Sequence, residues 1–114
     1  MKIYKVCSVE HWSNAKAAGI FEGVAVDIAD GYIHFSTADQ LAETLAKHFA
    51  GQTDLVLLTV DADKAGAELK WEPSRGGVLF PHLYAGLPLA AIEAEHALET
   101  DPKGVFVLPE GVAQ

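Results

Sequence analysis

The chain has 114 residues, half of them hydrophobic and 21% charged, which is the composition of one globular domain, residues 1–114, with a hydrophobic core. Its formal net charge is −8 and Arg75 is its single arginine, so the sequence argues against a broad basic face for nucleic acid but not against a small anionic ligand held by one or two cations. The single cysteine, Cys7, allows no intrachain disulfide, and no apolar run approaches the ~20 residues of a membrane-spanning helix, so we expect a cytoplasmic protein that does not enter membranes.

The N-terminal part predicts a strand followed by a helix. Residues 2–6 alternate as a strand does, and Ser8 offers an N-cap to a helix over residues 9–18. Gly19 can adopt the left-handed conformation that ends helices. Residues 20–31 contain two glycines and no sustained period, so we expect an irregular connection there.

A second strand and a second helix follow. Residues 31–36 alternate like a half-buried strand. A capping-box pattern begins at Thr37, and apolar residues recur every four positions up to Phe49. The pattern predicts a helix that ends at Gly51.

The second half of the chain is dominated by strand patterns. Residues 54–60 form a continuous apolar run, which is typical of a strand buried on both faces. Four further short strands are predicted at residues 68–72, 78–80 (broken by Pro81), 92–98 and 104–108. We therefore expect an α+β fold with a mainly antiparallel sheet of about six strands and two N-terminal helices.

The predicted strand at residues 92–98 bears on the oligomeric state. It alternates between apolar and charged residues, and Glu93, Glu95 and Glu99 would discourage pairing with another sheet if this strand lies at an edge. We expect a monomer.

The first candidate site lies where the strand at residues 31–36 meets the following helix. His34 shares a strand face with Ser36, and Thr37 stands at the helix N-terminus, whose free amides attract phosphate or carboxylate. An imidazole adds a group that can donate, accept or titrate near neutral pH. The alternative is that Thr37 is only a helix cap and His34 an ordinary hydrogen-bonded strand residue.

The second candidate site combines aromatic and titratable side chains with a lone arginine in a glycine loop. These residues are Trp71, Glu72, Arg75, Phe80, His82 and Tyr84. A guanidinium among glycines is suited to bind phosphate, because it forms paired charge-assisted hydrogen bonds. The alternative is a surface turn, with Trp71 and Phe80 in the core and Arg75 in solvent.

Three other interpretations are weaker. His34, Glu72 and His82 have the composition of a two-histidine, one-carboxylate metal site, but their spacing is not that of metal ligands, so we expect no metal. The sequence HFST matches half of the His-x-Ser/Thr signature of two-histidine phosphoesterases, but His82 is followed by no such hydroxyl residue. Cys7 ends an apolar strand, which is typical of an inert core thiol.

Four motifs in this order resemble those of the bacterial family called domain of unknown function 952, whose activity is not established. They are GYIHFST (31–37), DLVLLTVD (54–61), LKWEPSRGG (69–77) and FPHLYAGLPL (80–89). The resemblance covers nearly the whole chain, and the WE and FPHLY motifs are its most specific part.

That family is similar to a compact relative of the ADP-ribosyltransferase fold, which includes poly-ADP-ribose polymerases and RNA 2′-phosphotransferases. The resemblance implies that His34 takes the place of the residue beside the nicotinamide. Lys5 falls near the position of a ribose-binding histidine, and His82 near that of a glutamate. Because neither residue matches the type found in those enzymes, the resemblance supports the fold and the pocket more than the reaction.

Together these observations predict a cleft for a small anion of NAD, ADP-ribose or related nucleotide type, which is either a substrate or a bound metabolite. An ADP-ribosyl or phosphoryl transferase is the first hypothesis, and a non-catalytic binding module on the same fold is the alternative. The expected catalytic residues are His34, Glu72 and His82. The expected ligand-binding residues are Lys5, Ser36, Thr37, Trp71, Arg75 and Tyr84.

Overall fold

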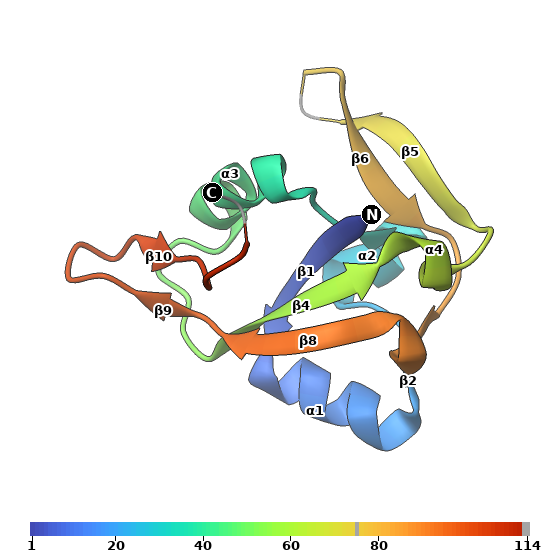
Figure 1. The fold of residues 1–114 in the computed structure, drawn as a ribbon, viewed down its shortest axis with the longest axis horizontal. Coiled ribbons are helices and arrows are strands. Elements are labelled where there is room, and N and C mark those ends of the chain that lie inside the picture. The colour runs from blue at the N-terminus through green and yellow to red at the C-terminus, as the bar shows by residue number, and fades with distance from the viewer. Residues whose placement is uncertain (75, 113–114) are drawn as a thin grey trace.

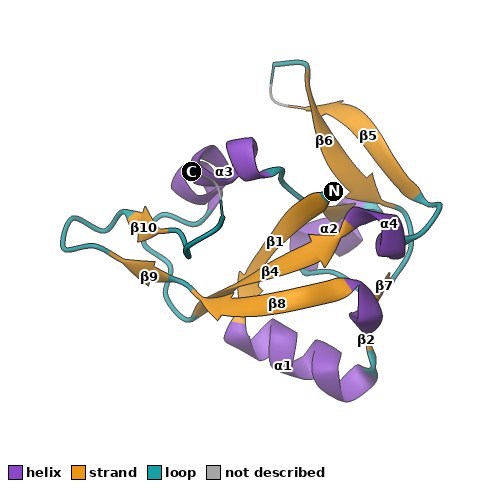
Figure 2. Cartoon of the chain, in the orientation of Figure 1, coloured by secondary structure: helices purple, strands orange, loops and turns teal. Residues whose placement is uncertain are grey.

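The computed structural model describes residues 1–74 and 76–112 (Figures 1 and 2). Its helices are α1 (Val9–Ala18), α2 (Ala25–Asp30), α3 (Ala38–His48), α4 (Ala62–Ala65) and the 3-10 helix η1 (Leu89–Ala91). Its strands are β1 (Lys2–Ser8), β2 (Ile20–Phe21), β3 (Ile33–His34), β4 (Leu55–Asp61), β5 (Leu69–Ser74), β6 (Val78–Leu83), β7 (Leu87–Pro88), β8 (Ile92–Ala97), β9 (Glu99–Thr100) and β10 (Phe106–Val107). The architecture is α+β with antiparallel strand pairing, as predicted.

The main sheet has the order β1-β4-β8, with β4 at its centre. The apolar run from Leu55 to Val60 is buried along its whole length, which confirms the prediction of a strand covered on both faces. Strand β8 lies at the edge and alternates between half-buried and exposed residues. The expected monomer stays a prediction.

Two groups of buried side chains cover the two faces of this sheet. On one face, Tyr4 and Val6 of β1 pack with Leu41 and Leu45 of α3. On the other face, residues of β1 and β4 pack with Trp12 of α1 and with the second sheet. Helix α1 runs alongside the main sheet in Figure 1, and α3 lies near the C-terminal end of the chain. The apolar stripe predicted for α3 is thus its buried side.

The second sheet has the order β3-β6-β5. It joins the main sheet where Tyr4 and Ser36 exchange backbone hydrogen bonds of 2.8 and 2.9 Å. Strand β6 runs through Pro81, so the predicted break is wrong. The carbonyl of Pro81 points toward β3 and accepts from the amide of Phe35, just past the end of that strand. The nitrogen of Pro81, which carries no proton, faces the same neighbour, so Pro81 costs no hydrogen bond between β6 and β5.

Several predicted elements need correction. Residues 20–31 are not irregular, because they contain β2 and α2. Helix α3 ends at His48 with Phe49 as its C-cap, rather than at Gly51. The chain turns after β4 through α4, and β10 pairs with β9 instead of closing the main sheet. The described strands form two three-stranded sheets and two short pairs rather than one sheet of six.

No helix among the described residues is both long enough and apolar enough to cross a membrane.

Candidate functional site

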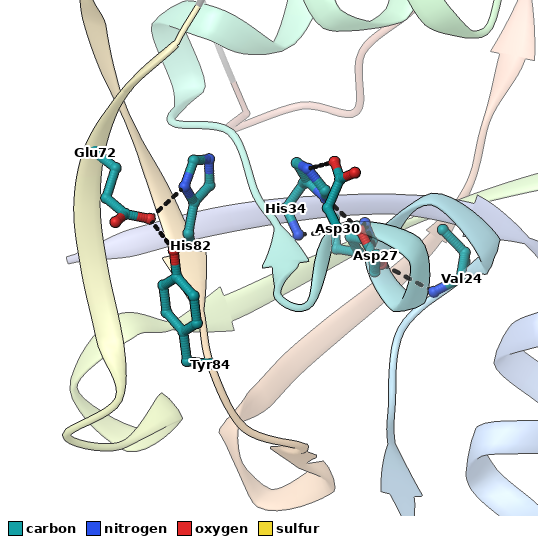
Figure 3. Close-up of polar contacts among 8 residues, drawn as sticks. Val24, Asp27, Asp30, His34, Glu72, His82 and Tyr84 are labelled. Atoms are coloured by element: carbon teal, nitrogen blue, oxygen red, sulfur yellow. Dashed lines mark hydrogen bonds and ion pairs between the residues drawn. The ribbon is translucent and has the colours of Figure 1, made fainter.

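The pairing of β3 with β6 brings two histidines together. His34 lies directly opposite His82 in the antiparallel register, and Glu72 of β5 lies opposite Phe80. Residues opposite one another share a sheet face, as do residues two apart along one strand. His34, His82, Glu72 and Tyr84 therefore lie on one face of the second sheet, as Figure 3 shows.

The first group of polar contacts centres on Asp27 of α2, which is 1% exposed. Lys5 Nζ lies 3.0 Å from Oδ1 of Asp27, to which it donates, and 2.8 Å from Oδ2. The carboxylate also accepts from two backbone amides, that of Val24 at 2.8 Å and that of His34 at 3.1 Å. It also contacts His34 Nδ1 at 2.6 Å. Each oxygen thus has more than one partner, so Asp27 fixes Lys5 and His34 to α2.

These contacts shift the pKa values of Asp27 and Lys5. Burial alone would raise the pKa of Asp27, but the hydrogen bond from His34 and the charge and hydrogen bond of Lys5 outweigh it, and the pKa falls to about 2. Burial lowers the pKa of Lys5, and the charge of Asp27 offsets only part of that shift. Asp27 is thus a stable buried anion, and the ammonium group of Lys5 is already engaged by it.

A second aspartate contacts the other side of the His34 ring. Asp30, the last residue of α2, places Oδ2 2.9 Å from His34 Nε2. Carboxylate oxygens only accept, so the contacts of Asp27 and Asp30 are both hydrogen bonds when both nitrogens of the ring carry protons. Two carboxylates therefore bracket one imidazole.

The second group consists of Glu72, His82 and Tyr84. His82 Nδ1 lies 2.8 Å from Glu72 Oε1, and the hydroxyl of Tyr84 donates to the same oxygen at 2.6 Å. This hydrogen bond raises the pKa of Tyr84 to about 12 and lowers the pKa of Glu72. In the neutral ring, the Nδ1 proton bonds to Glu72 and the lone pair is at Nε2, which has no hydrogen-bond partner among the described residues.

Tyr32 connects the two groups. Its ring centroid lies 4.5 Å from that of His34, 4.2 Å from that of His82 and 5.1 Å from that of Tyr84. The two imidazoles also meet edge to face, with centroids 5.5 Å apart. One packed aromatic cluster thus holds both histidines.

Both histidines line a pocket of about 510 Å³. Its other described lining residues are Tyr4, Lys5, Val6, Val24, Val26, Asp30, Phe35, Ser36, Thr44, His48, Phe49, Ser74 and Phe80. Most of the wall is apolar, and His34, Asp30 and His82 are among the polar side chains that interrupt it. Such a combination is typical of a small-molecule site.

Four of the nine predicted catalytic and ligand-binding residues line this pocket, namely Lys5, His34, Ser36 and His82, as does Phe80 of the second candidate site. Glu72 and Tyr84 are not lining residues but hold His82 in place. Arg75 lies outside the described residues.

Two predicted ligand-binding residues lie elsewhere. Thr37 is the N-cap of α3, and its backbone amide donates to Gln40 Oε1 at 2.9 Å, so this amide is satisfied within the helix. The pocket meets α3 nearer its C-terminus, at Thr44 and His48. Trp71 is paired with Pro81 and lies on the opposite face of β5 from Glu72, so it cannot form an aromatic wall with Tyr84.

Sequence reasoning missed Asp27 and Asp30, and it did not single out His48, which also lines the pocket. The two aspartates are three residues apart, a spacing that places side chains on one face of a helix. This spacing is visible in the sequence, but it indicates a shared face only if the segment is a helix. A six-residue helix without an apolar stripe is not predicted by the sequence pattern. The close approach of Gly23 was also missed: a Cβ added there would lie 2.7 Å from Cβ of Asp27.

The site also bears on metal binding. Among residues 1–74 and 76–112, no three His, Cys, Asp or Glu side chains are arranged so that they could hold a metal ion. The grouping of His34, Glu72 and His82 as metal ligands is therefore not supported by their positions.

A family model described as "Protein of unknown function (DUF952)" matches residues 6–95. The chain belongs to the DUF952 family. This confirms the family resemblance inferred from the GYIHFST and FPHLY motifs. No match to a curated protein was found for the DUF952 chain.

The DUF952 chain is also similar to solved structures of protein CC0527 from Caulobacter crescentus. The crystal structure shares 51% sequence identity over 94% of both chains, with a TM-score of 0.89. A crystal structure of a double mutant has 50% identity with the same coverage and TM-score. The solution NMR structure has 53% identity over 91% of this chain and 90% of the other, with a TM-score of 0.81. These names state no activity and no ADP-ribosyltransferase relationship, so the ADP-ribosyltransferase-like fold stays a prediction.

Proposed function

We propose that this DUF952 protein binds a small phosphorylated ligand of nucleotide type in the pocket and transfers or hydrolyses its phosphoryl group. The observation that carries the proposal is the placement of two imidazoles, His34 and His82, opposite each other in adjacent strands and on the wall of one pocket. Phosphoryl transfer needs a group that accepts a proton from the nucleophile and another that gives one to the leaving oxygen.

The surroundings of the two rings suit opposite roles. Glu72 holds the Nδ1 side of His82, so its Nε2 lone pair is directed away from Glu72 and can accept a proton. Asp30 Oδ2 lies 2.9 Å from His34 Nε2, so a proton on that nitrogen is oriented by a carboxylate at the pocket wall and can pass to a leaving oxygen. Two imidazoles with different hydrogen-bond partners on one pocket wall are an arrangement that acid-base catalysis can use.

The proposed reaction is an attack on phosphorus with one proton accepted and one proton donated. A water or hydroxyl oxygen forms a bond to phosphorus while its proton passes to His82 Nε2. The bond from phosphorus to the leaving oxygen breaks, and His34 Nε2 gives that oxygen a proton. With water as nucleophile, a phosphodiester becomes a phosphomonoester and an alcohol, and solvent returns the rings to their starting states.

The rest of the pocket supports a nucleotide-type ligand. Phe35, Phe80 and Val24 provide apolar surface for a base or sugar, and Ser36 provides a hydroxyl. Transfer of ADP-ribose from NAD is a less favoured reaction for the same pocket, because Lys5, which would stand at the ribose position, is already bonded to Asp27.

The test is turnover followed by ³¹P NMR. The purified protein is incubated with 2′,3′-cyclic nucleotides, a dinucleotide phosphodiester, NAD and ADP-ribose. We expect a new phosphomonoester signal, reduced about 10²–10⁴-fold by His82→Ala, which removes the proposed base. His96→Ala is the matched control, because His96 lies on β8 and does not line the site pocket.

Each result decides between the candidates. New ³¹P signals from the wild type and from His96→Ala but not from His82→Ala support the proposal. Release of nicotinamide from NAD without phosphoester cleavage would point to ADP-ribosyl transfer instead. Chemical-shift changes at His34 and His82 with no product would favour the non-catalytic binding module.

A further inference from the structure

Asp30 is the one acidic residue among the described residues that line the pocket. Its position is unexpected for a pocket that receives an anion, because its carboxylate lies beside a nitrogen that the ligand would use. Asp30 Oδ2 is 2.9 Å from His34 Nε2, whereas Asp27 holds the opposite nitrogen of the same ring.

We propose that His34 Nε2 and His82 Nε2 form a subsite for a phosphoryl oxyanion, and that the carboxylate of Asp30 occupies the His34 half of it until a ligand displaces it. This inference rests on the proposed function and names the part of the pocket where the phosphoryl group binds. It also makes Asp30 an internal competitor of the ligand.

The two aspartates differ in how firmly they are held. The side chain of Asp27 is 1% exposed and contacts Lys5, His34 and the amide of Val24, whereas that of Asp30 is 46% exposed and contacts His34. Asp30 also stands in the last turn of α2, where no basic residue is present and a carboxylate meets the negative end of the helix dipole. The carboxylate of Asp30 can therefore move away from His34 without disturbing the buried ion pair of Asp27 and Lys5.

His82 forms the other half of the subsite. Its side chain is 5% exposed and lines the pocket, yet its Nε2 has no hydrogen-bond partner among the described residues. Every fully buried side-chain nitrogen or oxygen of the described residues has a hydrogen-bond partner, so His82 Nε2 reaches the accessible surface of the pocket, where a ligand can bond to it. The rings of His82 and His34 are 5.5 Å apart between centroids, so one tetrahedral anion with several oxygens can reach both.

Among residues 1–74 and 76–112, the charged side chains that contact the two histidines are Asp27, Asp30 and Glu72, and Lys5 contacts Asp27. The charges of Asp30 and Glu72 add to the effect of burial in raising the pKa of Tyr32, which lies between the two histidines. Removing the charge of Asp30 therefore lowers the negative potential at the place where the anion would bind.

The experiment measures phosphate affinity from the imidazole ¹⁵N signals of His34 and His82. Inorganic phosphate is titrated into the wild type, Asp30→Asn and Asp30→Ala. Asp63→Asn is the control, because it removes the same charge from an exposed position on α4, outside the pocket. Acetate is titrated in parallel, since it has no hydroxyl that could donate to the lone pair of His82 Nε2 while another oxygen accepts from His34 Nε2, as hydrogen phosphate can.

We expect Asp30→Asn to bind phosphate about tenfold more tightly than the wild type, because a like charge next to the site is removed. Asp30→Ala should bind at least as tightly, Asp63→Asn should match the wild type, and the signals of both histidines should move. Adding His34→Gln to Asp30→Asn should abolish the gain. A stronger response to acetate than to phosphate would identify a carboxylate subsite and overturn the assignment to phosphoryl groups.

Equal affinity in Asp30→Asn and Asp63→Asn, or no phosphate binding to any variant, would overturn the subsite. The outcome is separable from that of the turnover assay. Tighter phosphate binding with no cleavage of any substrate leaves the subsite standing and removes the proposed reaction. If cleavage depends on His82 but Asp30→Asn does not change phosphate affinity, the proposed reaction stands and the subsite is removed.

Discussion

Asp27 connects three parts of the fold through a single carboxylate. It holds Lys5 of β1, the start of α2 at Val24 and the ring and amide of His34. An anion with these partners is much more stable in the folded protein than in the unfolded chain. The stability of the protein should therefore depend on the ionisation of this one group.

The first prediction concerns acid unfolding. Because the pKa of Asp27 is about 2 in the folded state and ~3.9 in an unfolded chain, the carboxylate stabilises the fold fully above pH ~5 and loses that contribution as the pH falls through about 2. The contribution is about 2–3 kcal/mol. Asp27→Asn should remove this part of the acid dependence and lower the free energy of unfolding at pH 7 by about 3 kcal/mol, since Lys5 loses its buried partner.

Urea unfolding at pH 7 and pH 3 measures both effects. Asp63→Asn serves as the control, because Asp63 is exposed and should leave the wild-type pH dependence in place. If Asp27→Asn and the wild type lose the same free energy between pH 7 and pH 3, Asp27 is not the group responsible.

The second prediction concerns Tyr84. The hydrogen bond to Glu72 is the main cause of its raised pKa of about 12, so Glu72→Gln should bring the pKa toward ~10. At pH 11 the phenol of Tyr84 would then change from roughly one tenth ionised to roughly nine tenths. The ¹³Cζ chemical shift of Tyr84 reports this directly, with Tyr84→Phe for assignment. An unchanged shift at pH 11, in protein that retains its dispersed amide spectrum, would contradict the hydrogen bond.

At the level of elements, α1 is stabilised by caps at both of its ends. Ser8 Oγ accepts from the amide of His11 at 3.0 Å, and Gly19 ends the helix with φ 84°. Ser8→Ala should lower the free energy of unfolding by about 1 kcal/mol, because one amide of the first turn loses its acceptor. Ser13→Ala, on the exposed side of the same helix, should leave it unchanged or slightly higher. Urea unfolding of both variants tests the difference, and equal values would mean that the cap contributes nothing.

These same local signals explain what could be predicted from the sequence. Helix α1 has its cap, its length and its terminating glycine within a dozen residues, and its predicted bounds match the structure. Helix α2 has six residues and no apolar stripe, and it is held chiefly by contacts of Asp27 with distant strands. No local pattern reports such contacts, so α2 and its two aspartates were missed.

The same distinction applies to the site as a whole. His34 could be singled out because a strand end next to a helix is visible in the sequence. Its pairing with His82 could not, because it depends on β6 running through Pro81 and packing between β3 and β5. The pleat then decides which neighbours share the pocket face, and it separates Trp71 from Glu72 although the two are adjacent in the chain.

At the scale of the whole molecule, Cys7 provides a probe of global unfolding. It is 2% exposed in the core between the two sheets, and burial raises its pKa to about 11. Strand β1 pairs with β4 along its whole length and with Ser36 through Tyr4, so no short segment can open to expose the thiol alone. The thiol should therefore react with a disulfide reagent only when the whole fold opens.

We expect Cys7 to react in native buffer at least roughly a thousandfold more slowly than an exposed thiol, given the usual free energies of unfolding. Cys7→Ala/Ser13→Cys supplies that exposed thiol on α1. In urea, the reaction rate of Cys7 should rise in parallel with the loss of far-ultraviolet circular dichroism. A rate in native buffer close to that of the Ser13→Cys thiol would show that β1 opens locally, and that Lys5, which lies on the same strand, is released from Asp27 without global unfolding.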